Sequence, residues 1–311
     1  MITVDQAKQR WEGVLIPIVT PFDEDLGLNV AALKRNIQWL MDRGARQGST
    51  VFLAAGSGGD FTSMNVAERK AVISAIAEVV DGRAPIIAGA QALDVRDTIE
   101  ICKHCEGLNI DAVQISGAFY YDGRPDDVVA WMKTVASQTS VGFAIYNNWY
   151  TGYDMPMDLI DQLLEIPNSI GVKWSSPDAE IFLEGCHRFA DRAAVVNNTF
   201  LTIPGHLVGL RTFVSHIANY QPEWCWQIWK LMESGQYRDA QQEFDRVMRP
   251  YRALVGKVAR ETGGEGVFVR PAMDAVGLEG GHSRLPSRDA AVSDEIKEGF
   301  RKLFASTSAQ I

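Results

Sequence analysis

The sequence predicts an α/β fold, a (β/α)8 TIM barrel followed by a C-terminal helical extension. Short apolar runs of strand length recur along the chain, amphipathic helical stretches separate them, and eight such runs are enough to close a barrel. With 311 residues, 46% of them hydrophobic, the chain can bury one large core. The predicted strands are Val14–Thr20, Val51–Ala55, Ile86–Gly89, Ala112–Ser116, Gly142–Tyr146, Ile170–Lys173, Ala194–Asn197 and Thr212–Ser215.

The stretches between these runs carry apolar residues at three- and four-residue spacing, which is typical of helices that pack one face on a sheet. Asn65, with Glu68 three residues later, predicts a capping box, and Asp178 is expected to cap the helix after the sixth strand. The predicted helices include Asn29–Arg43, Asn65–Val80, Val95–Leu108, Asp126–Ser137, Met157–Glu165 and Asp178–Phe189.

The strand-like runs end at Pro222, so we divide the chain into a barrel, residues 1–222, and a helical extension, residues 223–311. The extension has a helical pattern to about Thr262, and we expect breaks where glycine and proline interrupt it. The expected features are breaks near Gly235 and Pro250, loops at Gly263–Gly266 and Gly277–Arg288, and a last helix at Ala290–Phe304.

The charge balance, 30 basic against 39 acidic residues with a net charge of −9, disfavours a nucleic-acid-binding or polybasic membrane surface. The first residues, Met1 to Trp11, lack the charged and apolar segments of a signal peptide, and no later stretch has the apolar length of a membrane span. These features predict a cytoplasmic protein with no nucleic-acid or membrane partner.

Cysteine and histidine spacing does not predict a metal site. Four cysteines are too few for a disulfide framework in a chain of this length. Cys102 and Cys105 form a C-x-x-C pattern, but it lies in a predicted helix without a second ligand pair, so core thiols are favoured over zinc. The five histidines form no H-x-x-x-H or H-x-H set.

The sixth predicted strand ends on Lys173, which is unusual for a run expected to be buried on both faces. Desolvation disfavours the charged form of an amine, and a neutral lysine can attack a ketone to form a Schiff base. An alternative is that Lys173 extends to the sheet edge or pairs with a carboxylate such as Asp178.

Barrel active sites lie at the carboxyl ends of the strands, where two further features stand. The second strand leads into the glycine-rich turn Gly56–Gly59, whose amides, with the Ser57 hydroxyl, could bind a carboxylate. The fifth strand ends in Tyr146, whose phenol could carry protons near the lysine. The alternatives are a plain connecting turn and an ordinary tyrosine at the barrel mouth.

Taken in order and spacing, these motifs resemble the dihydrodipicolinate synthase/N-acetylneuraminate lyase family of class I aldolases. The resemblance covers nearly the whole chain, including the helical tail. It is carried by Pro17–Phe22, Gly56–Gly59, Tyr120-Tyr121, Tyr146-Asn147, Gly171–Lys173 and Ala218-Asn219.

The resemblance implies that Lys173 forms the Schiff base and Tyr146 relays protons, with no metal or organic cofactor. It implies that Ser57 and the amides of Ser57 and Gly58, in the turn opened by Gly56, hold the carboxylate of pyruvate or another 2-oxo acid. The backbone around Val214 would close the pocket beside the imine.

Tyr121 resembles the tyrosine that reaches into a neighbouring subunit's site in this family. The resemblance therefore implies a homo-oligomer, either a dimer or a dimer of dimers.

Departures from the family pattern bear on the substrate. Gly58 replaces the family's second hydroxyl, so the usual hydroxyl relay to Tyr146 cannot exist, and Asp60 replaces a glutamate. The proline and arginine that follow Tyr146-Asn147 in dihydrodipicolinate synthases are missing, which disfavours the synthase reaction itself, although dihydrodipicolinate synthase proper stays an alternative. Aromatic and amide residues suggest a different aldehyde side, unless they only pack the loops: Asn148, Trp149, Tyr150, Asn197, Asn198 and Thr199.

Three hypotheses of function follow. The first is a pyruvate-type aldolase that cleaves or forms a 4-hydroxy-2-oxo acid through an imine of Lys173. The second is dehydration of a deoxy-oxo sugar acid, because the segment from Ala54 to Phe61 is similar to the turn of 5-dehydro-4-deoxyglucarate dehydratases. The third is a 2-oxo-acid-binding protein without turnover. A metal-dependent barrel aldolase is disfavoured because no histidine and carboxylate cluster is evident.

Overall fold

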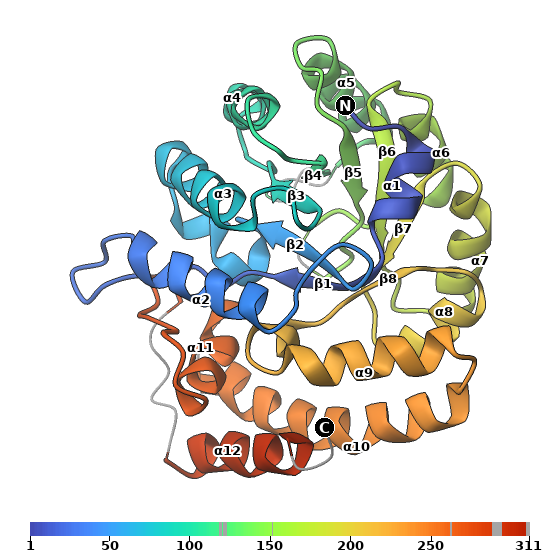
Figure 1. The fold of residues 1–311 in the computed structure, drawn as a ribbon. Helices are drawn as coiled ribbons and strands as arrows, with labels where there is room; N and C mark the ends of the chain where they lie inside the picture. Colours follow the sequence, from blue (N-terminus) through green and yellow to red (C-terminus); the bar gives the residue numbers. More distant parts are fainter. Residues whose placement is uncertain (118–119, 121–122, 151, 262, 288–293, 309–311) are drawn as a thin grey trace.

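Eight parallel strands close into one barrel in the order β1 to β8, surrounded by helices (Figure 1), and the predicted fold is confirmed. The computed structural model describes residues 1–117, 120, 123–150, 152–261, 263–287 and 294–308. The strands are β1 Gly13–Pro17, β2 Thr50–Ala54, β3 Ile86–Gly89, β4 Ala112–Ser116, β5 Phe143–Tyr146, β6 Ser169–Trp174, β7 Ala194–Asn197 and β8 Thr212–Val214.

Each predicted strand coincides with an observed one. β3, β4 and β7 have the predicted bounds, and the largest error is in β1, which ends at Pro17 instead of Thr20. Ile18, Val19 and Thr20 are buried at the barrel mouth, so an apolar run continues there after the strand ladder has ended. At this end of the barrel, residues can therefore be buried without belonging to a paired strand.

The helices between the strands form the outer layer (Figure 1). Asn65 and Glu68 form the predicted capping box at the start of α3, and Asp178 caps α7 through the amides of Glu180 and Ile181. Cys102 and Cys105 are buried free thiols of α4. The helices are α2 Val30–Asp42, α3 Val66–Val80, α4 Val95–Glu106, α5 Pro125–Ala136, α6 Met157–Leu164, α7 Ala179–Ala190, α8 Thr202–Leu207 and α9 Pro222–Glu233.

The N-terminal helix α1 (Val4–Arg10) covers the end of the barrel where the strands begin. Trp11, which follows α1, packs with the side chains that fill the barrel interior and donates to Asp111 just before β4. A Cβ atom at Gly171 would lie 2.4 Å from the Trp11 ring, so this strand position has room only for glycine. Side chains therefore fill the barrel interior at this end, beside a small cavity of about 100 Å³ whose wall includes Trp11, Ala194 and Thr212.

Three further helices pack beyond α9: α10 (Tyr237–Glu261), α11 (Gly266–Ala275) and α12 (Asp294–Ser308) (Figure 1). The predicted break near Gly235 is confirmed, but the break near Pro250 is wrong because Pro250 lies inside α10. Proline removes one helical hydrogen bond, but buried Val247 and Tyr251 on either side keep the helix docked through this point.

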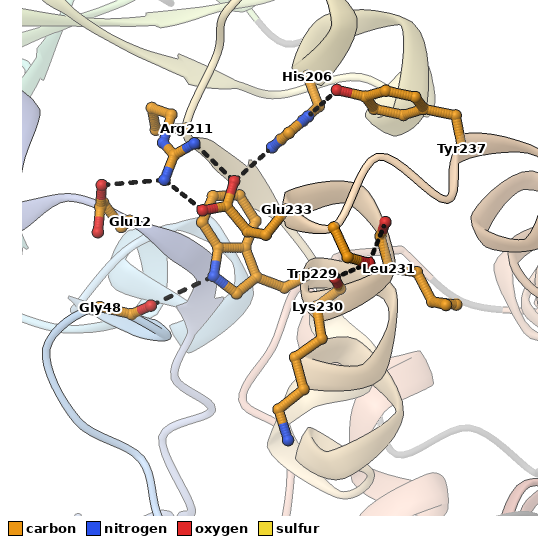
Figure 2. Close-up of polar contacts among 10 residues, drawn as sticks. Glu12, Gly48, His206, Arg211, Trp229, Lys230, Leu231, Glu233 and Tyr237 are labelled. Atoms are coloured by element: carbon orange, nitrogen blue, oxygen red, sulfur yellow. Dashed lines mark hydrogen bonds and ion pairs between the residues drawn. The ribbon is translucent and has the colours of Figure 1, made fainter.

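A charged cluster ties α9 to the beginnings of β1, β2 and β8 (Figure 2). Glu233 accepts hydrogen bonds from Arg211 at 2.5 Å and is 2.8 Å from His206, while Trp229 donates to the Gly48 carbonyl at 3.2 Å. This cluster joins the barrel to its C-terminal helices at the end remote from the strand tips. The division of the chain at residue 222 stays a prediction.

Membrane insertion finds no support among the described residues, where each helix is too short or too polar to cross a bilayer.

Candidate active site

Side-chain alternation along the strands brings the predicted residues together. Ala144 and Val196 point into the barrel interior, and so does the glycine at position 171, which contacts Trp11. Because strand side chains alternate, the residues two positions later face inward at the carboxyl end. Those residues are Tyr146, Lys173 and Asn198, and Tyr146 pairs directly with Lys173 in the register of β5 and β6.

Lys173 is buried, with 6% of its surface exposed. Its Nζ atom lies 4.1 Å from the centroid of the Tyr146 ring. Burial lowers the pKa of Lys173 to about 8, although the charge of Glu265 opposes this shift. Among the described residues no carboxylate lies within ion-pair distance of Nζ, and Asp178 caps α7 instead of pairing with it.

Hydrogen bonds of Asn147 fix the loop after Tyr146 to β6. The backbone N–H of Asn147 donates to the Lys173 carbonyl at 3.1 Å, and its side chain donates to the Ser175 carbonyl at 3.0 Å. The same side chain donates to Asp154 at 2.9 Å. These bonds hold the phenol and the amine at a constant separation, which a proton-transfer role requires.

A cavity of about 200 Å³ opens beside these residues at the carboxyl ends of the strands. Of the predicted residues, Ser57, Tyr146 and Asn148 form part of its wall. Lys173 is not part of this wall but contacts Tyr146, which is. The wall also includes Asp60, Phe61, Thr62, Gln91, Ser116, Gly117, Gly152, Tyr153, Gly264, Glu265 and Ser287.

The glycine-rich turn is a short 3-10 segment, Ser57–Gly59, with Gly56 before it. A Cβ atom at Gly58 would lie 3.0 Å from Nε2 of His216. The imidazole therefore occupies the space that a side chain at position 58 would need. This contact gives a physical reason for the glycine at the position where the related family has a hydroxyl.

Asp60, at the end of the turn, forms a buried ion pair with Arg270 of α11 at 2.6 Å. Arg270 also donates to the carbonyls of Thr20 and His282. A Cβ atom at Gly266 would lie 2.3 Å from the Asp60 carboxylate, so this position must be glycine. The pair thereby fixes the start of α11 against the strand-two turn.

Glu265, which was not predicted from the sequence, directly precedes Gly266 and has its carboxylate between Tyr150 and His216. Its carboxylate oxygens lie 3.5 Å from the Tyr150 hydroxyl and 3.6 Å from Nε2 of His216. Burial alone would raise the pKa of Glu265, but His216, Lys173 and Tyr150 together lower it below the usual value. The only sequence signal was an acidic residue among Gly263, Gly264 and Gly266, which is weak.

Tyr146, Tyr150 and Asn198 form a second group of interacting side chains. Burial raises the pKa of Tyr146 well above 10, and the nearby Tyr150 and Glu265 raise it further. The pKa of Tyr150 is also raised to about 12, although 47% of this residue's surface is exposed. The nearby Asn198 opposes both shifts. Both phenols therefore stay protonated at neutral pH.

Other predicted residues lie outside the cavity wall. Trp149 is 43% exposed and packs edge-on against Tyr150, with ring centroids 5.3 Å apart. Val214 is the last residue of β8, paired with Leu15 of β1. Tyr121 lies outside the described residues, so its predicted role between subunits stays a prediction.

Comparison with known proteins places this chain in one family. A sequence model of the Dihydrodipicolinate synthetase family matches residues 10–306. The 4-hydroxy-tetrahydrodipicolinate synthase of Methanosarcina mazei is 28% identical over 92% of this chain and 96% of its own. A probable 5-dehydro-4-deoxyglucarate dehydratase of Oceanobacillus iheyensis is 24% identical over 86% of this chain and 84% of its own.

Among solved structures, the chloride-inhibited dihydrodipicolinate synthase of Acinetobacter baumannii, complexed with pyruvate, superimposes with a TM-score of 0.83. It is 22% identical and covers 96% of this chain and 99% of its own. The fold and the buried amine define the class, a (β/α)8-barrel lyase of the Schiff-base type. Within that class, the chain belongs to the dihydrodipicolinate synthetase family, as its motifs predicted.

The buried pair between Asp60 and Arg270 yields a stability prediction. Asp60→Asn leaves the guanidinium charge without this carboxylate in a position that is 4% exposed, and it should lower the free energy of unfolding by about 3–5 kcal/mol. Urea denaturation measures the change. Glu279→Gln, which breaks the exposed pair with Arg35, is the matched control and should have a much smaller effect. Equal effects in both variants would show that the buried pair does not hold α11 in place.

Proposed function

We propose that this lyase cleaves or forms a 4-hydroxy-2-oxo acid, joining pyruvate or a similar 2-oxo acid to an aldehyde through an imine of Lys173. The observation that carries the proposal is the buried amine of lowered pKa, in contact with the Tyr146 ring at the edge of the cavity. An amine with a pKa of about 8 is neutral in a useful fraction of molecules near neutral pH.

The imine supplies the electron sink for the reaction. Nζ attacks the ketone carbon and water leaves, which gives a protonated imine. The C3–C4 bond then breaks, its electron pair moves to the imine nitrogen, and Tyr146 takes the proton of the C4 hydroxyl while its own phenolic proton passes to water. The aldehyde departs, and the enamine is protonated at C3. Water finally hydrolyses the pyruvate imine and frees Lys173.

The carboxylate of the 2-oxo acid is assigned to the turn at Ser57. Ser57 lines the cavity, and the backbone of the turn is free of side chains at Gly58 and Gly59. Backbone amides and a hydroxyl suit a carboxylate, because both donate hydrogen bonds to an anion.

The opposite wall favours an aldehyde without a second carboxylate. It lacks the arginine expected in dihydrodipicolinate synthases, and Glu265 brings a negative charge to the cavity. A second anionic group would meet that charge at low dielectric and be repelled. Neutral polyhydroxylated or aromatic aldehydes are therefore the preferred partners, and we propose a dimer of dimers as the assembly through Tyr121.

Dehydration of a deoxy-oxo sugar acid is the second candidate, because a probable 5-dehydro-4-deoxyglucarate dehydratase is among the relatives. It uses the same imine but expels the hydroxyl group as water. Glu265 opposes the second carboxylate of a sugar diacid, so the aldolase reaction is preferred. Measuring pyruvate release with several 4-hydroxy-2-oxo acids, against water loss from a sugar diacid, separates the two reactions.

Trapping of the imine tests the central step. Incubation with pyruvate and borohydride should leave a reduced adduct on the peptide that contains Lys173, detected by mass spectrometry after digestion. Lys173→Ala should give no adduct and yet fold, because it removes a buried amine that has no ion-pair partner among the described residues. An adduct elsewhere, or none in the unchanged protein, would refute the proposed function.

The rate of adduct formation should depend on pH. With a pKa of about 8, Lys173 becomes mostly neutral above that pH, so the rate should level off there and fall about tenfold per pH unit below it. An ordinary lysine would instead keep gaining rate up to about pH 10. Initial rates of adduct formation over this range decide between the two, and a midpoint near 10 would contradict the desolvation of this amine.

Replacement of the phenol tests the proton transfer. Tyr146→Phe keeps the ring that packs on Lys173 but removes the hydroxyl, so turnover should fall by about 10²–10⁴-fold while pyruvate trapping remains. Steady-state kinetics with a 4-hydroxy-2-oxo acid that the unchanged protein cleaves gives the measurement. Unchanged turnover would remove Tyr146 from the mechanism.

A further inference from the structure

We propose that Glu265 is a specificity-determining residue, whose carboxylate accepts a hydrogen bond from a hydroxyl group of a short, neutral, hydroxylated aldehyde. This inference rests on the proposed imine reaction and narrows its aldehyde partner to one class of compound. It assigns substrate recognition to the loop before α11, which is far in sequence from the barrel residues that carry the amine and the phenol.

The first step of the argument is the position of Glu265 in the cavity wall. Tyr146 belongs to the same wall, and Nζ of Lys173 lies 4.1 Å from the centroid of the Tyr146 ring. A substrate that is attached to Lys173 and extends past Tyr146 therefore enters the cavity that Glu265 lines. The side chain of Glu265 is 25% exposed, so its carboxylate is accessible to a ligand in this cavity.

The second step is the unused hydrogen-bonding capacity of the carboxylate. Oε1 of Glu265 lies 3.5 Å from the Tyr150 hydroxyl, and Oε2 lies 3.6 Å from Nε2 of His216. Short hydrogen bonds to oxygen have lengths of about 2.5–3.2 Å, and a carboxylate can accept about four of them. In the described part of the chain, no lysine or arginine lies within ion-pair distance of this group. A hydroxyl group of the substrate can therefore supply the missing donor.

The third step is that the loop carrying Glu265 is held in place. Gly264 has a φ of 92°, a conformation that favours glycine, and a Cβ atom at Gly266 would lie 2.3 Å from the Asp60 carboxylate. Asp60 is in turn paired with Arg270 of α11 at 2.6 Å. These contacts fix the loop against the strand-two turn. A recognition group benefits from such a support, because its position is set before the substrate binds.

The fourth step is the polarity of the remaining wall. Gln91 is 3% exposed, and its Oε1 atom has no hydrogen-bond partner among the described residues. Buried polar atoms without a partner are unfavourable, so this wall suits a ligand that can donate hydrogen bonds better than an apolar one. Its hydroxyl and amide side chains belong to Ser57, Thr62, Gln91, Ser116, Asn148 and Ser287.

Aromatic rings near the cavity are already engaged by the protein, which disfavours an aromatic aldehyde. The guanidinium of Arg69 lies 5.1 Å from the centroid of the Phe61 ring, and a Cβ atom at Gly123 would lie 2.6 Å from the Tyr153 ring. Trp149, which is largely exposed, is not part of the wall. The cavity, about 200 Å³, is also smaller than the ~300–1,000 Å³ of sites for drug-sized ligands. A short hydroxylated chain therefore fits it better than a ring.

Competition between two aldehydes in one reaction tests the proposal. Pyruvate is supplied together with glyceraldehyde and propanal, which have the same carbon chain and differ only in their hydroxyl groups, and mass spectrometry measures both products. Both aldehydes meet the same enamine on Lys173, so the product ratio reports recognition of the aldehyde and not formation of the imine. The unchanged protein should favour glyceraldehyde over propanal, and benzaldehyde should not compete with glyceraldehyde. A preference for benzaldehyde would overturn the proposal.

Substitution of Glu265 should change this product ratio. Glu265→Gln keeps the size of the side chain but removes its charge, and it should lower the ratio of glyceraldehyde product to propanal product by about tenfold. Glu265→Ala removes the acceptor and should lower the ratio by up to about 10²-fold. The intrinsic reactivity of each aldehyde cancels when ratios are compared between variants. A ratio that is the same in Glu265→Ala as in the unchanged protein would overturn the proposal.

An anionic aldehyde should respond in the opposite direction. Succinic semialdehyde carries a carboxylate that Glu265 repels, whereas butanal has the same chain length and no charge. In Glu265→Gln, the share of the succinic semialdehyde product should rise about tenfold or more, because the repulsion at low dielectric is removed. A residue with only a structural role would change both competitions in the same direction. Failure of the anionic share to rise would contradict recognition by this carboxylate.

The chain provides a matched control in a second glutamate near a histidine, Glu233 beside His206, at the opposite end of the barrel (Figure 2). Glu233→Gln should leave both product ratios unchanged, and an equal change in this variant would overturn the proposal. If the unchanged protein traps pyruvate on Lys173 but does not condense it with glyceraldehyde, the inference about Glu265 is wrong and the imine stands. Absence of trapping would instead refute the imine reaction itself.

Discussion

Desolvation of one amine is the constraint on which the site depends. Lys173 occupies the last inward position of β6, where the barrel interior gives way to the cavity, and burial there disfavours its ammonium form. The Tyr146 ring and the charge of Glu265 oppose this effect, because both stabilise a nearby cation. The amine is therefore held near the point where its neutral and charged forms are both accessible.

In the proposed reaction, both the neutral and the charged form of the Lys173 nitrogen take part. The neutral amine can attack a carbonyl, and the charged imine that follows takes the place of the ammonium beside Tyr146 and Glu265. A site without the carboxylate would favour the free amine but stabilise the imine cation less. In the proposed reaction, the charge of Glu265 therefore stabilises both the ammonium and the imine cation of Lys173.

The barrel and its C-terminal helices contribute differently to the site. The barrel sets the spacing of Tyr146 and Lys173 through the strand register, and side chains around Trp11 fill the interior at the opposite end. Two of the attachments of the C-terminal helices are Glu233 at the strand beginnings and Arg270 at the strand ends. The second lies beside the cavity, where it positions the loop that carries Glu265.

Local patterns in the sequence predicted the strands, their caps and the unusual lysine, because periodicity and burial act over a few neighbouring residues. They did not predict Glu265 or His216, whose significance comes from contacts with Tyr150 and Gly58 that are remote in sequence. The error at Pro250 has a similar origin, since tertiary packing of α10 outweighed a local helix-breaking signal. The sequence showed that Gly58 stands where the family has a hydroxyl, but only the structure showed that His216 occupies the space beside it.

Two departures from the family pattern are linked by this geometry. The arginine that would hold a second carboxylate is missing, and the loop that lacks it instead presents Tyr150 to Glu265. The second hydroxyl is missing from the strand-two turn, and His216 fills its space while facing the other oxygen of the same glutamate. Glu265 therefore lies next to both Tyr150 and His216, the residues found where the family's groups are missing. Under the proposed function the two changes act together: one removes the attraction for an anionic aldehyde, and the other replaces a hydroxyl with a carboxylate and imidazole pair.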